Sequence, residues 1–545
     1  MADVVRSRGL TDIPARIWKT TPLLAACVTY LLAGCALLPY NGIEDDESLF
    51  ANPIYRVVSR ECRIRVFHRN IPLMVMDYVG ALKSWIYSFI FAILEPSKVS
   101  VRLPVLLIGA ITIALFYRLL QQVVGNRAAI VGCFLLATDT IFLMTTLFDW
   151  GPVAIQHLAL VAGCVQLVAF HRTGSQWSLA CGFLALGLGL WDKAIFVWLL
   201  GGLAFAGLAV FPGSIVKRLC VRNVACASIA FLLGAWPLLV YNARHHWTTF
   251  RGNAAISSGE TAGKLMMLKY TINGSGLFGY MVNDADAGTG GPPETPLERA
   301  SVAIAKRCRE PKENYLLGAG CLTLAIFPLW RRRWREILFG LVFMAVAWIQ
   351  MAVTRNAGGG VHHTVLLWPF PHFVLAIALA EASQHYRRIG RPALIAVVTF
   401  LCATNLLVTN QYLSQLIRYG QSVPWTDAIY DLSDSLRPHE GEIYVADWGL
   451  FDQLIMLHKG KLAVHMVARA DGEFEDGQVD TMLADRRALF VTHVRDKRFF
   501  PKAGEHLESA AATRGYERQG LATVADTKGR PVFEVYRFGA ARGQR

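Results

Sequence analysis

Apolar residues along this chain gather in long runs that are separated by short charged segments. A helix needs about 20 apolar residues to cross a hydrocarbon core of about 30 Å, and several runs lack the polar stripe of a half-buried soluble helix. The pattern therefore predicts a polytopic, all-α membrane bundle of about eleven transmembrane helices. The expected spans are 21–39, 102–120, 127–147, 152–170, 176–191, 194–211, 223–241, 315–330, 336–354, 363–381 and 392–412.

A further apolar stretch, 71–94, is interrupted by Asp77 and Lys83. Amphipathic segments of this kind favour an interfacial or re-entrant helix, although a twelfth span stays open. The first run carries basic residues on its N-terminal side and no convincing cleavage site, so we expect an uncleaved anchor. Residues 1–20 are then a cytoplasmic N-terminus.

The charges between the runs predict which connections face the cytoplasm. Counted from a cytoplasmic N-terminus, every connection expected in the cytoplasm carries a positive cluster, as topology selection requires. Eleven spans then place the C-terminal tail outside. The clusters are Arg118 to Arg127, His171–Arg172, Lys217–Arg218–Arg222, Arg331–Arg332–Arg333–Arg335 and Arg387–Arg388–Arg391.

The same count divides the chain into a membrane part and a tail. We expect a transmembrane domain over 21–412 with two large exterior loops, 40–101 and 242–314. The tail, 413–545, is charged and contains short β-rich runs such as GEIYVADWG, ALFVTHV and PVFEVYRF, with helix-like stretches between them. This mixture predicts a soluble exterior α/β domain.

Composition agrees with a membrane protein, since 54% of the residues are hydrophobic and 17% are charged, against about 25% charged in soluble proteins. The net charge of +14 does not indicate a nucleic-acid partner, because Arg and Lys sit at the ends of apolar runs. Of the cysteines, Cys62 and Cys308 fall in exterior loops. They are either a disulfide of an oxidising compartment or two free thiols.

The first exterior loop opens with four consecutive acids, Glu44 to Glu47. A carboxylate at the membrane surface is suited to deprotonate an acceptor hydroxyl or to bind a cation such as Mg²⁺ or Mn²⁺. The alternative is a solvated helix cap, with Asp45 or Asp46 as the capping residue.

Basic residues follow in the same loop, against the charge bias of an exterior segment. They suit either a phosphate at the lipid surface or contact with anionic headgroups and nearby acids. These residues are Arg56, Arg60, Arg63, Arg65, His68 and Arg69.

Further polar residues lie at the exterior ends of other spans. Asp149 falls between the third and fourth spans, and Asp192–Lys193 between the fifth and sixth. The glycine-rich turn before the tenth span ends in His362 and His363, which are suited to phosphate or metal. Charges near the bilayer usually face a cavity or a partner, so we expect a common site. Simple turn residues are the alternative.

Together these segments resemble the GT-C superfamily, and most closely its branch of protein O-mannosyltransferases and lipid A aminoarabinose transferases. Asp46–Glu47 resembles the acidic "DE" motif, with Asp45 as an alternative register. Short matches to other motifs of the branch occur in the same order and on the same side, over roughly residues 20–380. These are Arg102–Leu103–Pro104 for R-L-P-S, Asp149, Lys193 in LWDKA for L-x-K-G, and His362, His363 and Pro369.

The resemblance implies an inverting glycosyltransferase that uses a polyprenyl-phosphate-linked sugar. Asp46 or Asp45 would activate the acceptor, while Glu47 and Asp149 shape the catalytic site. The O-mannosyltransferase-like branch is not expected to need a metal, so no cofactor is certain. The donor phosphate would be held by Lys193, Arg56, Arg63, Arg102, His362 and His363.

The acceptor would be an exterior glycan, lipid or protein, and the setting a bacterial-type inner membrane with the tail periplasmic or extracellular. Two other classes stay open. A transporter or flippase of a lipid-linked precursor would show paired repeats and broken helices, and we find neither in the sequence. A membrane sensor with an exterior domain would not depend on the acidic cluster.

Overall fold

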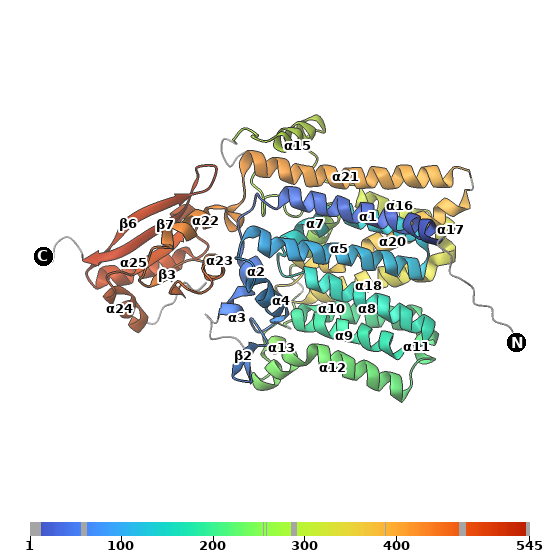
Figure 1. The fold of residues 1–545 in the computed structure, drawn as a ribbon, viewed down its shortest axis with the longest axis horizontal. Coiled ribbons are helices and arrows are strands. Elements are labelled where there is room, and N and C mark those ends of the chain that lie inside the picture. Colours follow the sequence, from blue (N-terminus) through green and yellow to red (C-terminus); the bar gives the residue numbers. More distant parts are fainter. Residues whose placement is uncertain are drawn as a thin grey trace.

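The structure is a computed structural model that describes residues 12–55, 63–253, 255–257, 259–284, 291–386, 388–467 and 476–540. It consists of a bundle of long helices with a smaller α/β domain at one end (Figure 1). This arrangement confirms the predicted class of fold, a polytopic helical bundle followed by an α/β domain.

All eleven predicted segments fall on helices of the bundle. Among the described residues, six helices are long and apolar enough to cross a membrane alone, and a bent pair makes up to seven. Shorter apolar helices occupy three of the other segments, and a helix of 17 residues occupies 176–191. The bundle helices are α1 (Asp12–Leu37), α5 (Lys98–Val123), α6 (Asn126–Thr138), α7 (Thr140–Leu147), α8 (Ala154–Thr173), α9 (Gln176–Asp192), α10 (Val197–Val210), α12 (Val221–Arg244), α16 (Leu316–Ala325), α17 (Phe327–Trp330), α18 (Trp334–Val353), α19 (Val361–Thr364), α20 (Phe370–His385) and α21 (Gly390–Tyr419).

The bent pair is α6 and α7, which meet at 59°. Asp139 sits at the break and accepts the N–H of Phe142 at 2.7 Å, so it caps α7. Its other oxygen lies 3.2 Å from Nε2 of His372 on α20. A polar cap with a partner on a neighbouring helix stabilises this interruption of the span.

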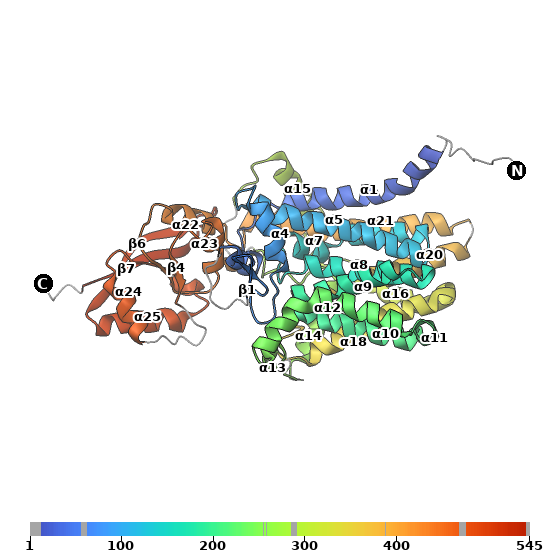
Figure 2. The same ribbon diagram turned by 60° about the horizontal axis from the view of Figure 1, so that its bottom comes forward.

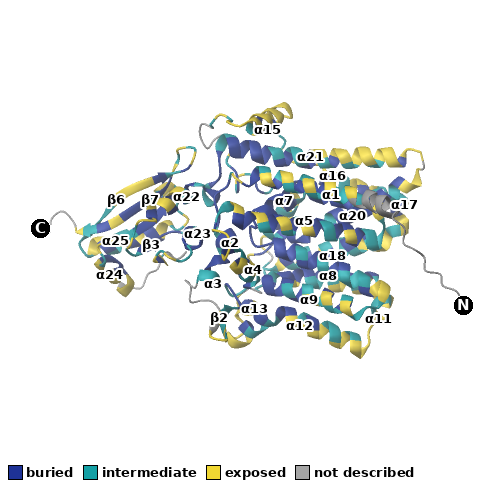
Figure 3. Ribbon diagram, viewed as in Figure 1, coloured by how far each residue is buried: buried dark blue, intermediate teal, exposed yellow. Residues whose placement is uncertain are grey.

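The outer surface of the bundle is apolar where water-soluble proteins are polar. Large side chains on α12 and α21 are exposed, among them Leu233 at 62% and Phe400 at 53%. Figure 3 shows α21 mostly exposed over the half that lies farther from the α/β domain and mostly buried over the nearer half, and α12 has the same distribution. Exposed apolar area of this extent marks a surface that faces lipid.

The two ends of the bundle collect different loops. At the end near the α/β domain, short backbone bridges join Val79 to Lys193, Ile256 to Thr354 and Val282 to Gln421. At the opposite end lie α11 (Pro212–Val216) and α17 (Figures 1 and 2), and there Arg218 donates to the carbonyl of His171 at 3.0 Å. The loops predicted to be exterior therefore share one end, and the cationic loops share the other.

Segment 71–94 does not cross the bundle. Its only helix is α4 (Leu82–Phe91), which has 10 residues and whose length of about 15 Å is half of a hydrocarbon core. An isolated bridge between Met74 and Gly80 precedes the helix. A twelfth span is therefore excluded. The other elements of segments 40–101 and 242–314 are α2 (Asp45–Ser48), α3 (Ala51–Tyr55), β1 (Arg63–Val66), β2 (Arg69–Pro72), α13 (Thr248–Asn253), α14 (Thr261–Ile272) and α15 (Pro296–Arg307).

The last bundle helix, α21, continues past residue 412 to Tyr419. The apolar run ends near residue 412, but polar side chains of the final turns of the helix bind residues of segment 242–314. Asn410 donates to the carbonyl of Ser301 at 3.0 Å, and Gln415 donates to Asp284 at 3.0 Å. The α/β domain begins after this helix, later than the expected boundary.

The α/β domain is built on a sheet with the strand order β4-β3-β5-β7-β6. β3 pairs in parallel with β4 and β5, whereas β7 runs antiparallel to β5 and β6. Apolar residues of both faces are buried beneath helices. The elements are α22 (Ala428–Leu436), β3 (Ile443–Val445), α23 (Phe451–Leu457), β4 (Val464–Met466), α24 (Asp476–Ala484), β5 (Leu489–His493), α25 (Pro501–Thr513), β6 (Tyr516–Ala525) and β7 (Pro531–Ala540).

Candidate active site

The acidic segment folds as a capped helical turn, α2. Glu44 is the capping residue: its carboxylate accepts the N–H of Asp46 at 2.7 Å, and Glu47 accepts the N–H of Glu44 at 3.4 Å. This reciprocal pair is a capping box. The expectation that Asp45 or Asp46 would cap a helix is wrong, because Glu44 takes that position. Asp45 and Asp46 are half-buried and point elsewhere.

Glu47 and Arg102 form a buried ion pair, with Arg102 Nε 2.7 Å from Glu47 Oε1. Arg102 donates a second hydrogen bond to Glu47 at 2.9 Å and three more to the carbonyls of Leu38, Asn41 and Gly42 at 2.7–2.9 Å. These bonds use all five N–H groups of a guanidinium. Arg102 therefore has no donor left for a phosphate, contrary to expectation. Glu47 and Arg102 fix the loop that follows α1 to α5.

Asp149 links two elements of the site. Its Oδ1 accepts the N–H groups of Val153 and Ala154 at 3.0 Å each and so caps the start of α8. Its Oδ2 lies 2.6 Å from Nζ of Lys83 on α4, with both side chains almost fully buried. Lys83 is not among the site residues predicted from the sequence. Its only signal was a charge within the apolar stretch 71–94.

Asp46 faces the two buried lysines of this region. Its carboxylate accepts a backbone hydrogen bond from Gly151 and interacts electrostatically with Lys193 and Lys83. Burial raises the pKa of Asp46 above its ordinary value, and the two cations oppose that rise. Asp46 is therefore a carboxylate beside two cations, placed to accept a proton.

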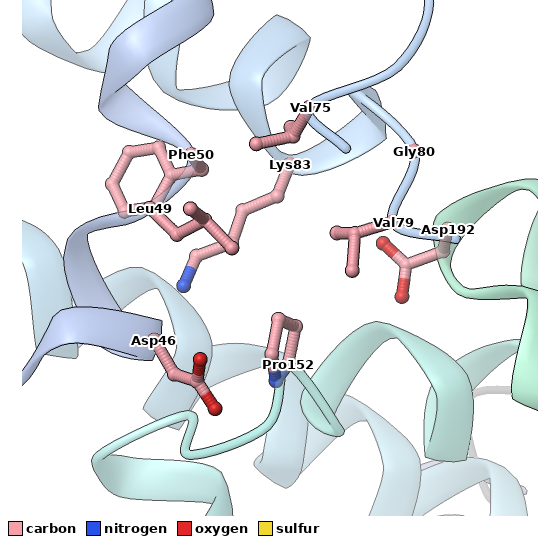
Figure 4. Close-up of a pocket in the computed structure, with 9 residues that line it drawn as sticks. All are labelled: Asp46, Leu49, Phe50, Val75, Val79, Gly80, Lys83, Pro152 and Asp192. Carbon is pink, nitrogen blue, oxygen red and sulfur yellow. The ribbon is translucent and has the colours of Figure 1, made fainter. Parts of the chain in front are cut away.

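A small pocket opens beside these groups. The amino group of Lys83 points toward Asp46, whereas Asp192 lies on the other side of Val79 and Pro152 (Figure 4). The lining residues are Asp46, Leu49, Phe50, Val75, Val79, Gly80, Lys83, Pro152 and Asp192.

Lys193 is held at the junction of three loops. Its Nζ donates to the carbonyl of Gly151 at 2.8 Å, and the neighbouring Asp192 carbonyl accepts the N–H of Gly80 at 2.9 Å. Ala194 donates to the carbonyl of Tyr78 at 2.9 Å. The backbone thus positions Lys193 next to the turn that also bonds to Asp46.

The two histidines lie on the other side of the same turn. The ring of His362 is 4.4 Å from that of Trp150 and 4.0 Å from that of His363. Gly151 has φ +69°, and a side chain there would meet the Cβ of His362 at 2.7 Å. The close approach of the histidine turn therefore requires glycine at this position.

The remaining predicted residues are not part of this cluster. Arg63 lies on β1, opposite Pro72 of β2, and does not line the pocket. Arg56 and Cys62 fall outside the described residues, so the role of Arg56 and the Cys62–Cys308 disulfide stay predictions. Within the described ranges, no three His, Cys, Asp or Glu side chains are grouped as for a metal ion. A Mg²⁺ or Mn²⁺ ion also stays a prediction.

One family model and several solved structures match this chain. Residues 80–241 match the family model of dolichyl-phosphate-mannose-protein mannosyltransferases. The structure of ArnT from Cupriavidus metallidurans in the apo state superposes with a TM-score of 0.59 at 13% identity, over 96% of this chain and 98% of ArnT. ArnT bound to undecaprenyl phosphate gives 0.57 at 13% identity, over 95% and 98%.

A second relative by structure is archaeal. The oligosaccharyltransferase AglB from Archaeoglobus fulgidus, in complex with an inhibitory peptide and a dolichol-phosphate, gives a TM-score of 0.52 at 12% identity, over 97% of this chain and 75% of AglB. This chain has the GT-C fold. No curated protein matches it by sequence. The GT-C fold therefore extends over both the bundle and the α/β domain, while identity is too low to carry over any residue role.

Proposed function

We propose that this protein is an integral membrane glycosyltransferase that moves a sugar from a polyprenyl-phosphate donor to an acceptor at the α/β end of the bundle. The observation that carries the proposal is Asp46 facing Lys83 and Lys193 at a pocket between exterior loops. A base and two cations are the groups that transfer of a sugar from a lipid phosphate requires.

In this reaction, the acceptor hydroxyl attacks the anomeric carbon while the bond from that carbon to the phosphate oxygen breaks. Asp46 takes the proton of the attacking hydroxyl as a general base. The bonding electrons leave with the lipid phosphate, which gains negative charge. Attack from the face opposite the phosphate inverts the configuration of the sugar.

Lys83 and Lys193 stabilise the charge on the departing phosphate. An ammonium group has three N–H donors. Lys83 directs one N–H to Asp149 and a second to the Glu47 carbonyl at 3.4 Å. Lys193 directs one N–H to the Gly151 carbonyl. Each lysine therefore retains a donor for a phosphate oxygen. Preorganised cations at developing charge contribute strongly to catalysis in water-poor sites.

The comparisons support the proposed class of sugar donor. ArnT is described with undecaprenyl phosphate and AglB with a dolichol-phosphate, and the matching family is named for dolichyl-phosphate-mannose. A polyprenyl-phosphate sugar is the donor class these share. The acceptor is an exterior glycan, lipid or protein.

The charges of the loops supply the orientation. The cationic ends of the bundle, with Arg172, Arg218 and Arg333, lie opposite the α/β domain, and positive loops stay in the cytoplasm. We place the N-terminus in the cytoplasm and the α/β domain outside a bacterial-type inner membrane. Accessibility of single cysteines introduced at Lys217 and Glu505 to an impermeant reagent tests this, and labelling of Lys217→Cys from outside would contradict it.

Substitution of Asp46 by Asn tests the function. Membranes that contain the protein are supplied with a labelled polyprenyl-phosphate sugar, and transfer of label to membrane or exterior acceptors is measured. We expect the variant to lose transfer while its expression and insertion match wild type. Lys459→Ala, at an ion pair with Glu95 outside the pocket, serves as the matched control. Full transfer by Asp46→Asn would refute the proposal.

A further inference from the structure

Asp192 is a buried acid to which the proposed reaction assigns no role. It is the last residue of α9 and is 1% exposed. Its carboxyl group forms no hydrogen bond or ion pair with any residue in the described part of the chain. Only its backbone carbonyl is bonded, to the N–H of Gly80. Burial of a carboxyl group without a partner is strongly unfavourable, so stability does not account for Asp192.

The other buried acids of the bundle do have partners. Each one that the structure describes in the bundle and its loops accepts at least one hydrogen bond, from a backbone N–H group or from a buried arginine. These acids are Glu44, Glu47, Asp139 and Asp149. The fold therefore supplies partners for buried carboxylates elsewhere, and the exception at Asp192 indicates a group that binds a ligand.

Asp192 lines the pocket of the candidate active site. Asp46 and Lys83 belong to one part of this pocket, and Asp192 lies beyond Val79 and Pro152 (Figure 4). The pocket thus has two polar parts with an apolar part between them. A sugar ring has a matching distribution, because its faces carry C–H groups and its rim carries hydroxyls. A ring whose anomeric carbon lies near Asp46 can therefore direct a hydroxyl toward Asp192.

The two lysines of the site bond to other groups. Lys83 Nζ lies 2.6 Å from Asp149, and Lys193 Nζ donates to the carbonyl of Gly151 at 2.8 Å. Lys193 directly follows Asp192, but its backbone is extended, with φ −154° and ψ 127°, and no longer helical. Asp192 is therefore available to a group of the substrate, while the lysines stay placed for the lipid phosphate.

We propose that Asp192 is a specificity-determining residue, whose carboxyl group forms a hydrogen bond with a hydroxyl of the donor sugar. The inference rests on the proposed function and deepens it, because it separates recognition of the sugar from recognition of the lipid phosphate. A carboxyl group accepts hydrogen bonds in both of its protonation states, so the contact does not depend on the charge of Asp192. A sugar that lacks this hydroxyl leaves the carboxyl group buried without a partner and is rejected.

Two substitutions of Asp192 separate hydrogen bonding from shape. Leu cannot form the hydrogen bond, so Asp192→Leu should bind undecaprenyl phosphate as wild type does but lose the affinity that the sugar adds, by about tenfold or more. Asn still forms a hydrogen bond, so Asp192→Asn should keep that added affinity to within about threefold. Asp192→Leu should unfold at or above the wild-type temperature, because it removes an unpaired buried carboxyl group.

The experiment measures the Kd of the full-length protein in detergent by tryptophan fluorescence. The ligands are undecaprenyl phosphate and undecaprenyl-phosphate mannose, glucose, galactose and N-acetylglucosamine. The sugar that adds most affinity in wild type is then compared with its monodeoxy forms. One of these forms should bind wild type and Asp192→Leu equally, because the hydroxyl and the carboxyl group are the two halves of one contact. Asp496→Leu, at an exposed acid of the α/β domain, is the control and should bind each ligand as wild type does.

Several results would overturn the inference. Asp192→Leu that keeps the affinity added by the sugar, or Asp192→Asn that loses it, would exclude the hydrogen bond. Weaker binding of undecaprenyl phosphate by Asp192→Leu would make Asp192 a partner of the lysines, and earlier thermal unfolding would make its role structural. A wild-type protein that binds undecaprenyl phosphate but gains no affinity from any of the four sugars would also contradict it. Transfer by Asp46→Asn would instead overturn the proposed function itself.

Discussion

The buried pair of Arg102 and Glu47 permits a prediction that separates a structural role from a phosphate-binding one. Arg102→Met removes a guanidinium that donates five hydrogen bonds, two of them to Glu47. Both residues are fully buried. Glu47 is then a buried carboxylate without its cation, and removal of one member of a buried ion pair costs about 3–5 kcal/mol of unfolding free energy.

The reciprocal change should cost a similar amount for the same reason. Glu47→Gln leaves a buried guanidinium whose charge is no longer balanced. Because both single variants lose one shared interaction, the double variant Arg102→Met/Glu47→Gln should be destabilised by less than the sum of the two. Three loop carbonyls still lose their donor in the double variant, so recovery is partial.

Thermal unfolding of the purified protein in detergent, followed by tryptophan fluorescence, measures these differences. Lys459→Ala removes an ion pair whose carboxylate, Glu95, is exposed, so this control should unfold much as wild type does. The reasoning would be refuted if Arg102→Met unfolded like wild type but raised the KM for the lipid donor. That result would restore the phosphate role that the sequence suggested.

Four further outcomes follow from the site. Lys83→Met should lower kcat by about 10²-fold or more in the transfer assay, since it removes a cation at the developing charge; an unchanged kcat would contradict its role. Gly151→Ala should reduce both stability and activity, because φ at this position is +69° and the new side chain meets His362. Thermal unfolding tests this, with Gly213→Ala as the control because the space around Gly213 is open. Wild-type kcat should fall with decreasing pH through a pKa above that of an exposed aspartate, because burial raises the pKa of Asp46; a limb near pH 4 would argue against it. Asp139→Ala should destabilise the α6–α7 bend by about 1 kcal/mol or more, as a lost cap, and leave the KM for the donor unchanged.

The sequence predicted those features that depend on local pattern. Apolar runs gave all eleven membrane segments, and loop charges predicted which loops share an end of the bundle. Asp46, Asp149, Lys193 and His362 were expected to converge because their loops fall on one side, and the structure places them around Gly151. Sidedness therefore carries information about a site that no single motif provides.

Other features depend on partners that lie far apart along the chain. Asn52 and Asp452 are separated by 400 residues, so nothing near either residue predicts their contact. Lys83 stood in an apolar stretch, where its charge indicated only an interruption. The role of Arg102 depends on three backbone carbonyls of the preceding loop. A sequence does not indicate which backbone carbonyls will accept hydrogen bonds from a distant side chain.

In the proposed reaction, the bond between sugar and phosphate breaks at the pocket that Asp46 and Lys83 line, next to Lys193. The most direct measurement follows a labelled polyprenyl-phosphate sugar by mass spectrometry in proteoliposomes that contain the purified protein and an acceptor extract from the host envelope. We predict free polyprenyl phosphate and a glycosylated acceptor with wild type, and intact donor with Asp46→Asn. Intact donor that crosses the bilayer with wild type and variant alike would contradict the claim and identify a flippase.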